Sequence, residues 1–192
     1  MHKGRLEAFS DGVIAIIITI MVLELKTPHV AELSALKPMI PIFISYLLSF
    51  VFVAIYWNNH HHLMQPVQKV NGAILWANMH LLFWLSLVPF TTAWMGENNF
   101  ASWPVSLYGV VLLLAGVAYF VLTRVLLAHH AKDSALSRGI GSDFKGKVSI
   151  AIYAVAIFLS FWNSKVAYSL YAWVAVMWLV PDKRIERVIA HE

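Results

Sequence analysis

The sequence predicts an all-α membrane protein with six transmembrane helices. Of the 192 residues, 60% are hydrophobic and only 12% are charged, whereas a soluble domain is nearer half apolar and a quarter charged. The apolar residues are gathered in runs of the length that crosses a bilayer, about 20 residues. Lysines and arginines occupy the short segments between these runs. This combination indicates a chain folded in lipid.

The helices are expected at residues 4–26, 38–59, 71–94, 103–129, 148–163 and 166–181. The last apolar block is too long for one span and is interrupted by Asn163-Ser164-Lys165, which predicts a tight hairpin of two short helices. One long helix would leave Lys165 in the hydrocarbon at a cost of a few kcal/mol. No linker-like stretch divides the chain, so residues 1–192 are expected to form a single domain.

The distribution of basic residues orients the helices. If both termini are cytoplasmic, eleven basic residues lie inside and only Lys26, Lys37 and Lys165 lie outside, which is the excess of positive charge expected on the cytoplasmic side. Five helices would place the basic C-terminal cluster outside, so the same rule favours six. The residues expected inside or at the inner boundary are Lys3, Arg5, Lys69, Arg124, Lys132, Arg138, Lys145, Lys147, Lys183, Arg184 and Arg187.

Several function classes find no support in the residues. The net charge of +4 follows from topology and not from a nucleic-acid-binding face. The absence of cysteine excludes disulfides and thiolate metal sites. No zinc-protease motif, phosphate-binding loop or pair of carboxylates lies within the apolar segments. The sequence therefore predicts neither an enzyme nor a bound cofactor or metal.

The start of the first helix carries the most informative polar residues. Ser10 and Asp11 directly precede the unbroken apolar run Gly12–Leu23. A carboxylate this close to hydrocarbon is costly unless it is paired or faces water. A polar network between helices, or the entrance of a pore, is favoured over simple exposure in the headgroup zone.

Three motifs within residues 1–95 carry a resemblance to a known family. They are Arg5-x-x-x-Phe9-Ser10-Asp11, Tyr56-Trp57-Asn58-Asn59-His60-His61-His62, and a third segment with Asn71, Trp76-Ala77-Asn78 and Val88-Pro89-Phe90-Thr91-Thr92. Together they resemble the signature of the transmembrane protein 175 family of potassium channels. In that family prokaryotic members carry one six-helix repeat, so the resemblance implies a homotetramer in an inner cell membrane.

The resemblance also implies a role for the first helix, which would line a central pore in four copies. The family's hydrophobic constriction falls on Ile16, Ile20 and Leu23, with a pore-facing hydroxyl at Thr19. Independently, Gly12, Ile16, Thr19, Ile20, Leu23 and Thr27 recur at spacings of three and four residues and so share one helix face. Such a stripe is also common in plain packing or lipid contact. Ala15 stands where some members carry serine.

The expected activity is a leak-type cation channel with a modest preference for K⁺ over Na⁺. No Thr-Val-Gly-Tyr-Gly filter of stacked carbonyls is present, so a narrow ring of apolar side chains would have to gate the ion. Three alternatives remain: a proton-permeable channel, a secondary cation transporter, and a membrane subunit without transport activity.

The consecutive residues His60, His61 and His62 suggest structure more than metal binding. Adjacent helical residues point about 100° apart and cannot all reach one ion. One of these rings, with Trp57 or Asn78, is expected to bond to Ser10 or Asp11 of the first helix. The predicted network comprises Arg5, Phe9, Ser10, Asp11, Trp57, His61 and Asn78.

Overall fold

The computed structural model describes residues 2–129 and 144–179, and every regular element in these two ranges is helical. The elements are α1 (Lys3–Leu23), the 3₁₀ helix η1 (Leu33–Met39), α2 (Ile40–Met64), α3 (Gly72–Ser86), α4 (Val88–Glu97), α5 (Ser102–Ala128), α7 (Phe144–Leu159) and α8 (Ser164–Leu179). Lys132, Arg138, Lys183, Arg184 and Arg187 of the topology prediction lie outside the described residues, as do positions 180–181 of the last predicted helix.

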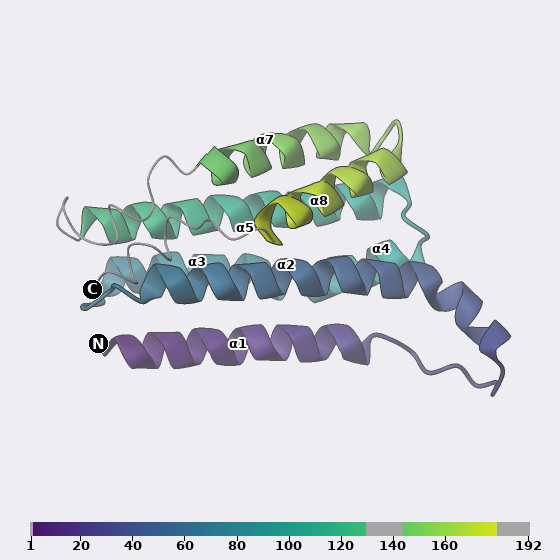
Figure 1. Ribbon diagram of the computed structural model, residues 1–192, viewed down its shortest axis with the longest axis horizontal. Helices are drawn as coiled ribbons and strands as arrows, with labels where there is room; N and C mark the ends of the chain where they lie inside the picture. The colour runs from purple at the N-terminus through teal and green to yellow at the C-terminus, as the bar shows by residue number, and fades with distance from the viewer. Residues whose placement is uncertain (1, 130–143, 180–192) are drawn as a thin grey trace.

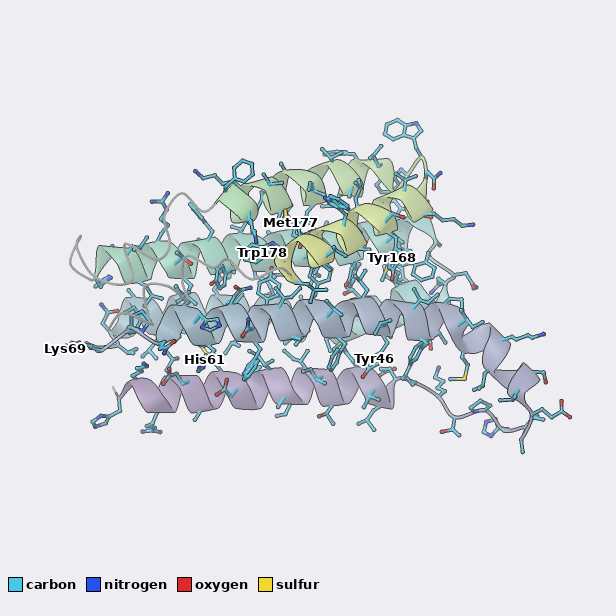
Figure 2. All side chains as sticks on the ribbon, in the orientation of Figure 1. Tyr46, His61, Lys69, Tyr168, Met177 and Trp178 are labelled. Atoms are coloured by element: carbon cyan, nitrogen blue, oxygen red, sulfur yellow. The ribbon has the colours of Figure 1, made fainter. Side chains whose placement is uncertain are left out.

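The helices run back and forth as an antiparallel bundle (Figure 1). α1 lies along one side against α2, and the α7–α8 hairpin lies on the opposite side, against α5. Lys69, in the connection between α2 and α3, marks the end of the bundle at which α1 begins (Figure 2). The prediction of an all-α membrane protein is confirmed.

Four segments within the described ranges are long and apolar enough to cross a bilayer: Lys3–Leu23, Leu33–Met64, Gly72–Glu97 and Ser102–Ala128. α7 and α8 have 16 residues each, which at 1.5 Å per residue is about 24 Å and less than the hydrocarbon thickness of about 30 Å. The last apolar block therefore consists of two short helices and not of one long span. Asn163 starts α8, because its Oδ1 accepts hydrogen bonds from the amides of Lys165 (3.1 Å) and Val166 (3.2 Å).

The second and third predicted helices differ from the observed ones. α2 continues past residue 59 to Met64, so His60–His62 lie within the helix, and its start at Ile40 is preceded by η1. The expected single helix 71–94 is two helices, α3 and α4, broken at Leu87. Pro89 explains the break, since it lacks an N–H and its ring clashes with the carbonyl four residues earlier.

Two hydrophobic clusters hold the bundle together. The first joins α1, α2, α3 and α5, and the second joins α2, α5, α7 and α8. In the second, the fully buried ring of Tyr171 lies directly against Gly109 of α5, where a Cβ would collide with the tyrosine hydroxyl. Glycine at this position lets α8 approach α5. α2 and α5 belong to both clusters and form the centre of the fold, which leaves α1 at its edge.

Candidate functional site

α1 has one anchored face and one uncovered face. Leu6, Ser10, Ile14, Ile17 and Met21 are buried against the rest of the chain. Their spacing of three and four residues places them on one side of the helix. α1 packs mainly on α2, α3 and α4. It is thus bound firmly along this side only.

The four residues predicted to form a pore lie on the uncovered side. Ile16 is 60% exposed, Ile20 42% and Leu23 74%, and Thr19 is exposed between them. Within the described ranges no other helix covers them. A largely apolar stripe that faces away from its own subunit is available to lipid or to another copy of the chain.

The hydroxyl of Thr19 is oriented by its own helix. Thr19 Oγ1 donates a hydrogen bond to the carbonyl oxygen of Ala15 at 2.9 Å. Since the single hydroxyl proton is used in this way, the oxygen presents its lone pairs to whatever lies outside the helix. An oxygen with free lone pairs is a ligand for a cation.

A buried chain of hydrogen bonds fastens the anchored face to α3 and α2. Ser10 Oγ donates to the carbonyl oxygen of Leu6 (2.8 Å), so it must accept from Asn78 Nδ2 (2.9 Å). Asn78 Oδ1 then faces His60 Nε2 at 2.8 Å and accepts from it. Ser10 and Asn78 are fully buried, and His60 is 2% exposed. The three hydrogen bonds of this chain therefore each have one fixed direction.

A second link joins α1 to α2 nearer the surface. Trp57 Nε1 donates to Asp11 Oδ1 at 2.9 Å. The ring of Trp57 stacks on that of His61, with 6.2 Å between centroids and 24° between planes. His61 thus contacts the network through stacking, while the hydrogen bond to Asn78 comes from His60. Arg5 and Phe9 are exposed on α1 and take part in neither link.

Two contacts at the ends of α1 were not anticipated from the sequence. At the start of α1, Lys3 Nζ donates to the carbonyl oxygen of Gln65 (2.8 Å), just past the end of α2. Beyond its other end, Lys26 Nζ bonds to Glu97 Oε1 (2.7 Å) at the end of α4. Lysine and glutamate at distant positions carry no signal of such pairing in a single sequence.

The described residues contain no group of three or more histidine, cysteine, aspartate or glutamate side chains placed to hold a metal ion. His60, His61 and His62 point in different directions on α2, toward Asn78, Trp57 and a buried position respectively. In the part of the chain that the structure describes, the site is a helix face supported by hydrogen bonds.

Known proteins resemble this chain in sequence. Residues 5–89 match the family model described as the endosomal/lysosomal potassium channel TMEM175. A potassium channel of Chryseobacterium sp. (strain P1-3) is 54% identical over 187 residues, which cover 97% of this chain and 97% of that protein. The chain belongs to the TMEM175 family. All of the hydrogen-bond network, from Ser10 to Asn78, lies within the segment that the TMEM175 model matches.

The fold agrees with the family as well. The crystal structure of a lysosomal potassium-selective channel TMEM175 homolog from Chamaesiphon minutus superposes with a TM-score of 0.80 at 31% identity, covering 93% of this chain and 96% of that one. Human TMEM175, named an endosomal/lysosomal proton channel, is 28% identical over 150 residues, which are 69% of this chain and 29% of the human protein. TMEM175 is described as a channel family and not as a class of enzyme.

Proposed function

We propose that this chain is one subunit of a homotetrameric, potassium-permeable leak channel whose pore is lined by four copies of α1. One observation carries the proposal: the face of α1 that bears Ile16, Thr19, Ile20 and Leu23 is uncovered, while the opposite face is fastened by buried hydrogen bonds. Support comes from the bacterial relative named a potassium channel and the homolog titled a potassium-selective channel.

A closed ring of four subunits gives this face a partner. In cyclic symmetry the same residue of each copy lies at one height along the axis. Ile16 and Ile20 would form rings about 6 Å apart, with Leu23 about 4.5 Å further, from the rise of 1.5 Å per residue. Isoleucine and leucine offer no oxygen to replace the water around an ion, so a narrow ring dewets and blocks conduction.

Selectivity in such a pore is modest. A slightly wider apolar ring passes an ion that keeps part of its water, and K⁺ releases water more readily than Na⁺. Thr19 adds a ring of hydroxyl oxygens between the apolar rings, and its donation to Ala15 leaves the lone pairs free for the ion. The result is a K⁺ preference weaker than that of a filter built from carbonyl oxygens.

The proposed orientation has the start of α1 in the cytoplasm. Of the described lysines and arginines, Lys26, Lys37 and Lys165 lie at one end of the bundle. The other six, at the end where α1 starts, are Lys3, Arg5, Lys69, Arg124, Lys145 and Lys147. The excess at that end is the one expected for the inner side of a cell membrane.

Proton permeation is a second candidate, because the relatives from Danio rerio and Homo sapiens are named proton channels. Reversal potentials measured with K⁺ and H⁺ gradients varied separately distinguish the two ions. A secondary transporter is less well supported: the break at Leu87 interrupts a helix, but no charged residue lies beside it in α3 or α4 as far as Met95.

Cysteine scanning of α1 tests the pore assignment, because the wild-type chain contains no cysteine. Thr19→Cys and Leu23→Cys are expected to lose K⁺ flux in liposomes when a positively charged thiol reagent is added. Ile17→Cys, on the anchored face, and Val22→Cys, exposed but off the pore stripe, are the controls. Equal block in all four variants, or block in none, would contradict a pore formed by this face.

A further inference from the structure

The end of α1 carries an acidic residue that is free of ion pairs. Glu24 follows Leu23, the last residue of α1, and its backbone keeps a helical conformation (φ −71°, ψ −12°). It therefore lies about 40° round the helix from Ile20 and about 6 Å further along the axis, at the edge of the uncovered stripe. Its side chain is exposed, and no ion pair among the described residues includes it.

The nearest basic residue in the sequence, Lys26, is held by a different carboxylate. Lys26 Nζ lies 2.7 Å from Glu97 Oε1 at the end of α4. Because α4 packs on α1 within the same subunit, this pair directs the Lys26 side chain toward its own subunit. The hydrogen bond and charge of Glu97, and more weakly the charge of Glu24, raise the pKa of Lys26. The three charged groups thus lie near one another, with a net charge of −1 per subunit.

Other charged residues at this end of the bundle do not cancel that charge. Glu32 and Lys37, in the connection between α1 and α2, have opposite signs. Lys165 lies at the start of α8, and the α7–α8 hairpin is on the side of the bundle opposite α1 (Figure 1). The excess of negative charge therefore stays at the end of the uncovered face of α1.

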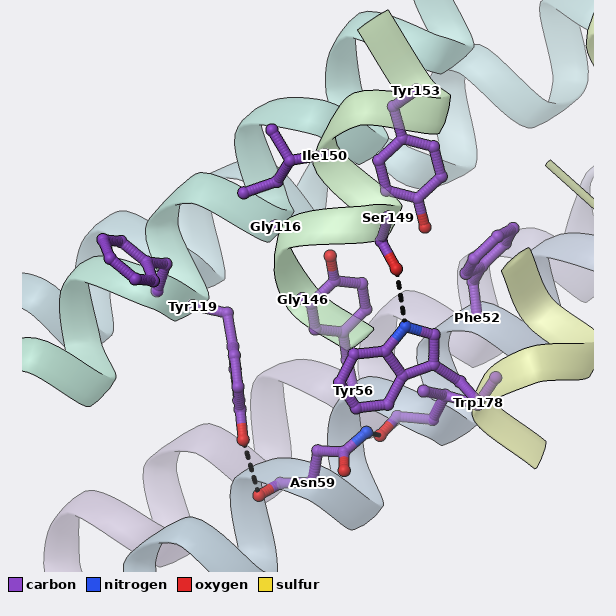
Figure 3. A pocket seen from close by; sticks show the side chains of 12 residues that line it. Phe52, Tyr56, Asn59, Gly116, Tyr119, Gly146, Ser149, Ile150, Tyr153 and Trp178 are labelled. Carbon is purple, nitrogen blue, oxygen red and sulfur yellow. Dashed lines mark hydrogen bonds between the residues drawn. The ribbon is translucent and has the colours of Figure 1, made fainter. Parts of the chain in front are cut away.

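A crevice between α2, α5, α7 and α8 differs from this region in both room and charge (Figure 3). Its space of about 40 Å³ is enough for water molecules but not for a hydrated cation. None of the twelve described residues that line it carries a charged side chain. The crevice therefore does not compete with the face of α1 as a place for a cation.

We propose that four copies of Glu24 form a ring of carboxylates at the mouth of the pore, and that this ring raises K⁺ conductance by concentrating cations beside the Leu23 ring. The inference rests on the proposed function, because a closed ring of subunits around α1 is what brings the four carboxylates together. A mouth lined by one sign of charge raises the local concentration of the opposite ion. Glu97 is a positioning residue, since it neutralises Lys26 and keeps four ammonium groups from cancelling the ring.

Single-channel recording of the full chain in planar bilayers tests the ring. The current measured is the one carried by K⁺ that enters at the Glu24 end. Glu24→Gln is expected to lower conductance about twofold or more in about 0.1 M KCl, where the Debye length is about 10 Å, and to approach the wild type in about 1 M KCl, where it is about 3 Å. Glu24→Asp keeps the charge and is expected to conduct nearly as the wild type does at both concentrations.

The Lys26–Glu97 pair allows a test in which charge is changed and then restored. In about 0.1 M KCl, Glu97→Gln is expected to lower conductance, because it leaves the Lys26 charge unpaired at the mouth, and Lys26→Gln is expected to raise it. The double variant Lys26→Gln/Glu97→Gln has the net charge of the wild type and is expected to return to its conductance. Lys165→Gln, which removes a positive charge at the same end but on the opposite side of the bundle, is the control and should change nothing.

A Glu24→Gln channel that conducts as the wild type does in about 0.1 M KCl would overturn the proposal, as would a double variant that conducts no better than Glu97→Gln alone. Leu23→Cys distinguishes this failure from a failure of the proposed function. If the thiol reagent blocks Leu23→Cys, the pore stands and only the ring is wrong; if it does not, the pore and the ring are excluded together. The substituted side chains are exposed or half-buried in an ion pair at the surface, and light scattering checks that each variant assembles.

Discussion

Asn78 Nδ2 donates a hydrogen bond of 2.9 Å to Ser10 Oγ, and both residues are completely buried. The bond joins α3 to α1, and His60 extends it to α2. Buried hydrogen bonds have direction, whereas contacts between apolar side chains in lipid do not. The rotation of α1 about its own axis is consequently set on one side, and this determines which residues the other side presents.

Ser10→Ala should destabilise the protein by about 1–3 kcal/mol, because Asn78 Nδ2 would remain buried without an acceptor. Thermal unfolding in detergent, followed by the loss of the monodisperse species, measures the effect. Ser169→Ala is the matched control: this serine also donates to the carbonyl four residues earlier, but it is exposed on α8. A Ser10→Ala variant that melts with the control would show that the network contributes little.

Asp11→Ala should reduce the tetramer fraction, since Trp57 Nε1 loses its acceptor and α1 loses its second link to α2. Asp11→Asn retains an oxygen at Oδ1 and should assemble nearly as the wild type does. Size-exclusion chromatography with light scattering gives the oligomeric state. Normal assembly and conduction of Asp11→Ala would exclude this link as a requirement.

Ile20→Ala and Leu23→Ala should increase single-channel conductance and lower the discrimination between K⁺ and Na⁺. Shorter side chains widen the apolar ring and let water and ion pass together. Planar-bilayer recordings with K⁺ and Na⁺ exchanged measure both quantities. Val22→Ala, which shortens an apolar side chain about as exposed as that of Ile20 but beside the stripe, should leave them unchanged; the same change in all three variants would argue against the ring.

The pair Lys26–Glu97 should hold the segment after α1 near the end of α4 at all ordinary pH values. The hydrogen bond to Glu97 raises the pKa of Lys26 above the usual lysine value. A raised lysine pKa means that the contribution is complete at lower pH and is lost only as pH rises through that value, above about pH 10.

Hydrogen exchange of residues 24–39 at pH 7 measures this link. Glu97→Gln should speed exchange there, and the difference should shrink at high salt, because the Lys26 side chain is 76% exposed and the pair is screened by ions. Glu32→Gln, in the same connection but outside this ion pair, is the control. Exchange that does not respond to Glu97→Gln would show that the pair does not restrain the segment.

The sequence anticipated the elements that follow from composition and local pattern. These are the apolar runs of bilayer length, the interruption at Asn163-Ser164-Lys165 and the polar start of the first helix. Each depends only on residues that are close together in the sequence. The break at Leu87 follows only in part from local sequence: Pro89 disfavours a continuous helix, but the geometry that separates α3 from α4 depends on the packing of α3 on α5 and of α4 on α2 and α5.

Of the predicted network, Ser10, Asp11, Trp57 and Asn78 take part in the observed hydrogen bonds, whereas Arg5 and Phe9 do not. Adjacent histidines on a helix differ by 100° in direction, and a short error in the helix phase exchanges His60 for His61. The partner of Asn78 is fixed by how α2 lies against α3, which is a tertiary property.

Ion flux into liposomes containing the purified wild-type protein tests the central claim most directly. K⁺ and Na⁺ gradients are compared at fixed pH, with protein-free vesicles and the Leu23→Cys variant blocked by thiol reagent as controls. The predicted result is a wild-type flux that is faster for K⁺ than for Na⁺ and requires no counter-transported ion. The flux through Leu23→Cys should be abolished by the thiol reagent. Folded tetrameric protein that passes neither ion, or passes only protons, would contradict the assignment of a potassium channel.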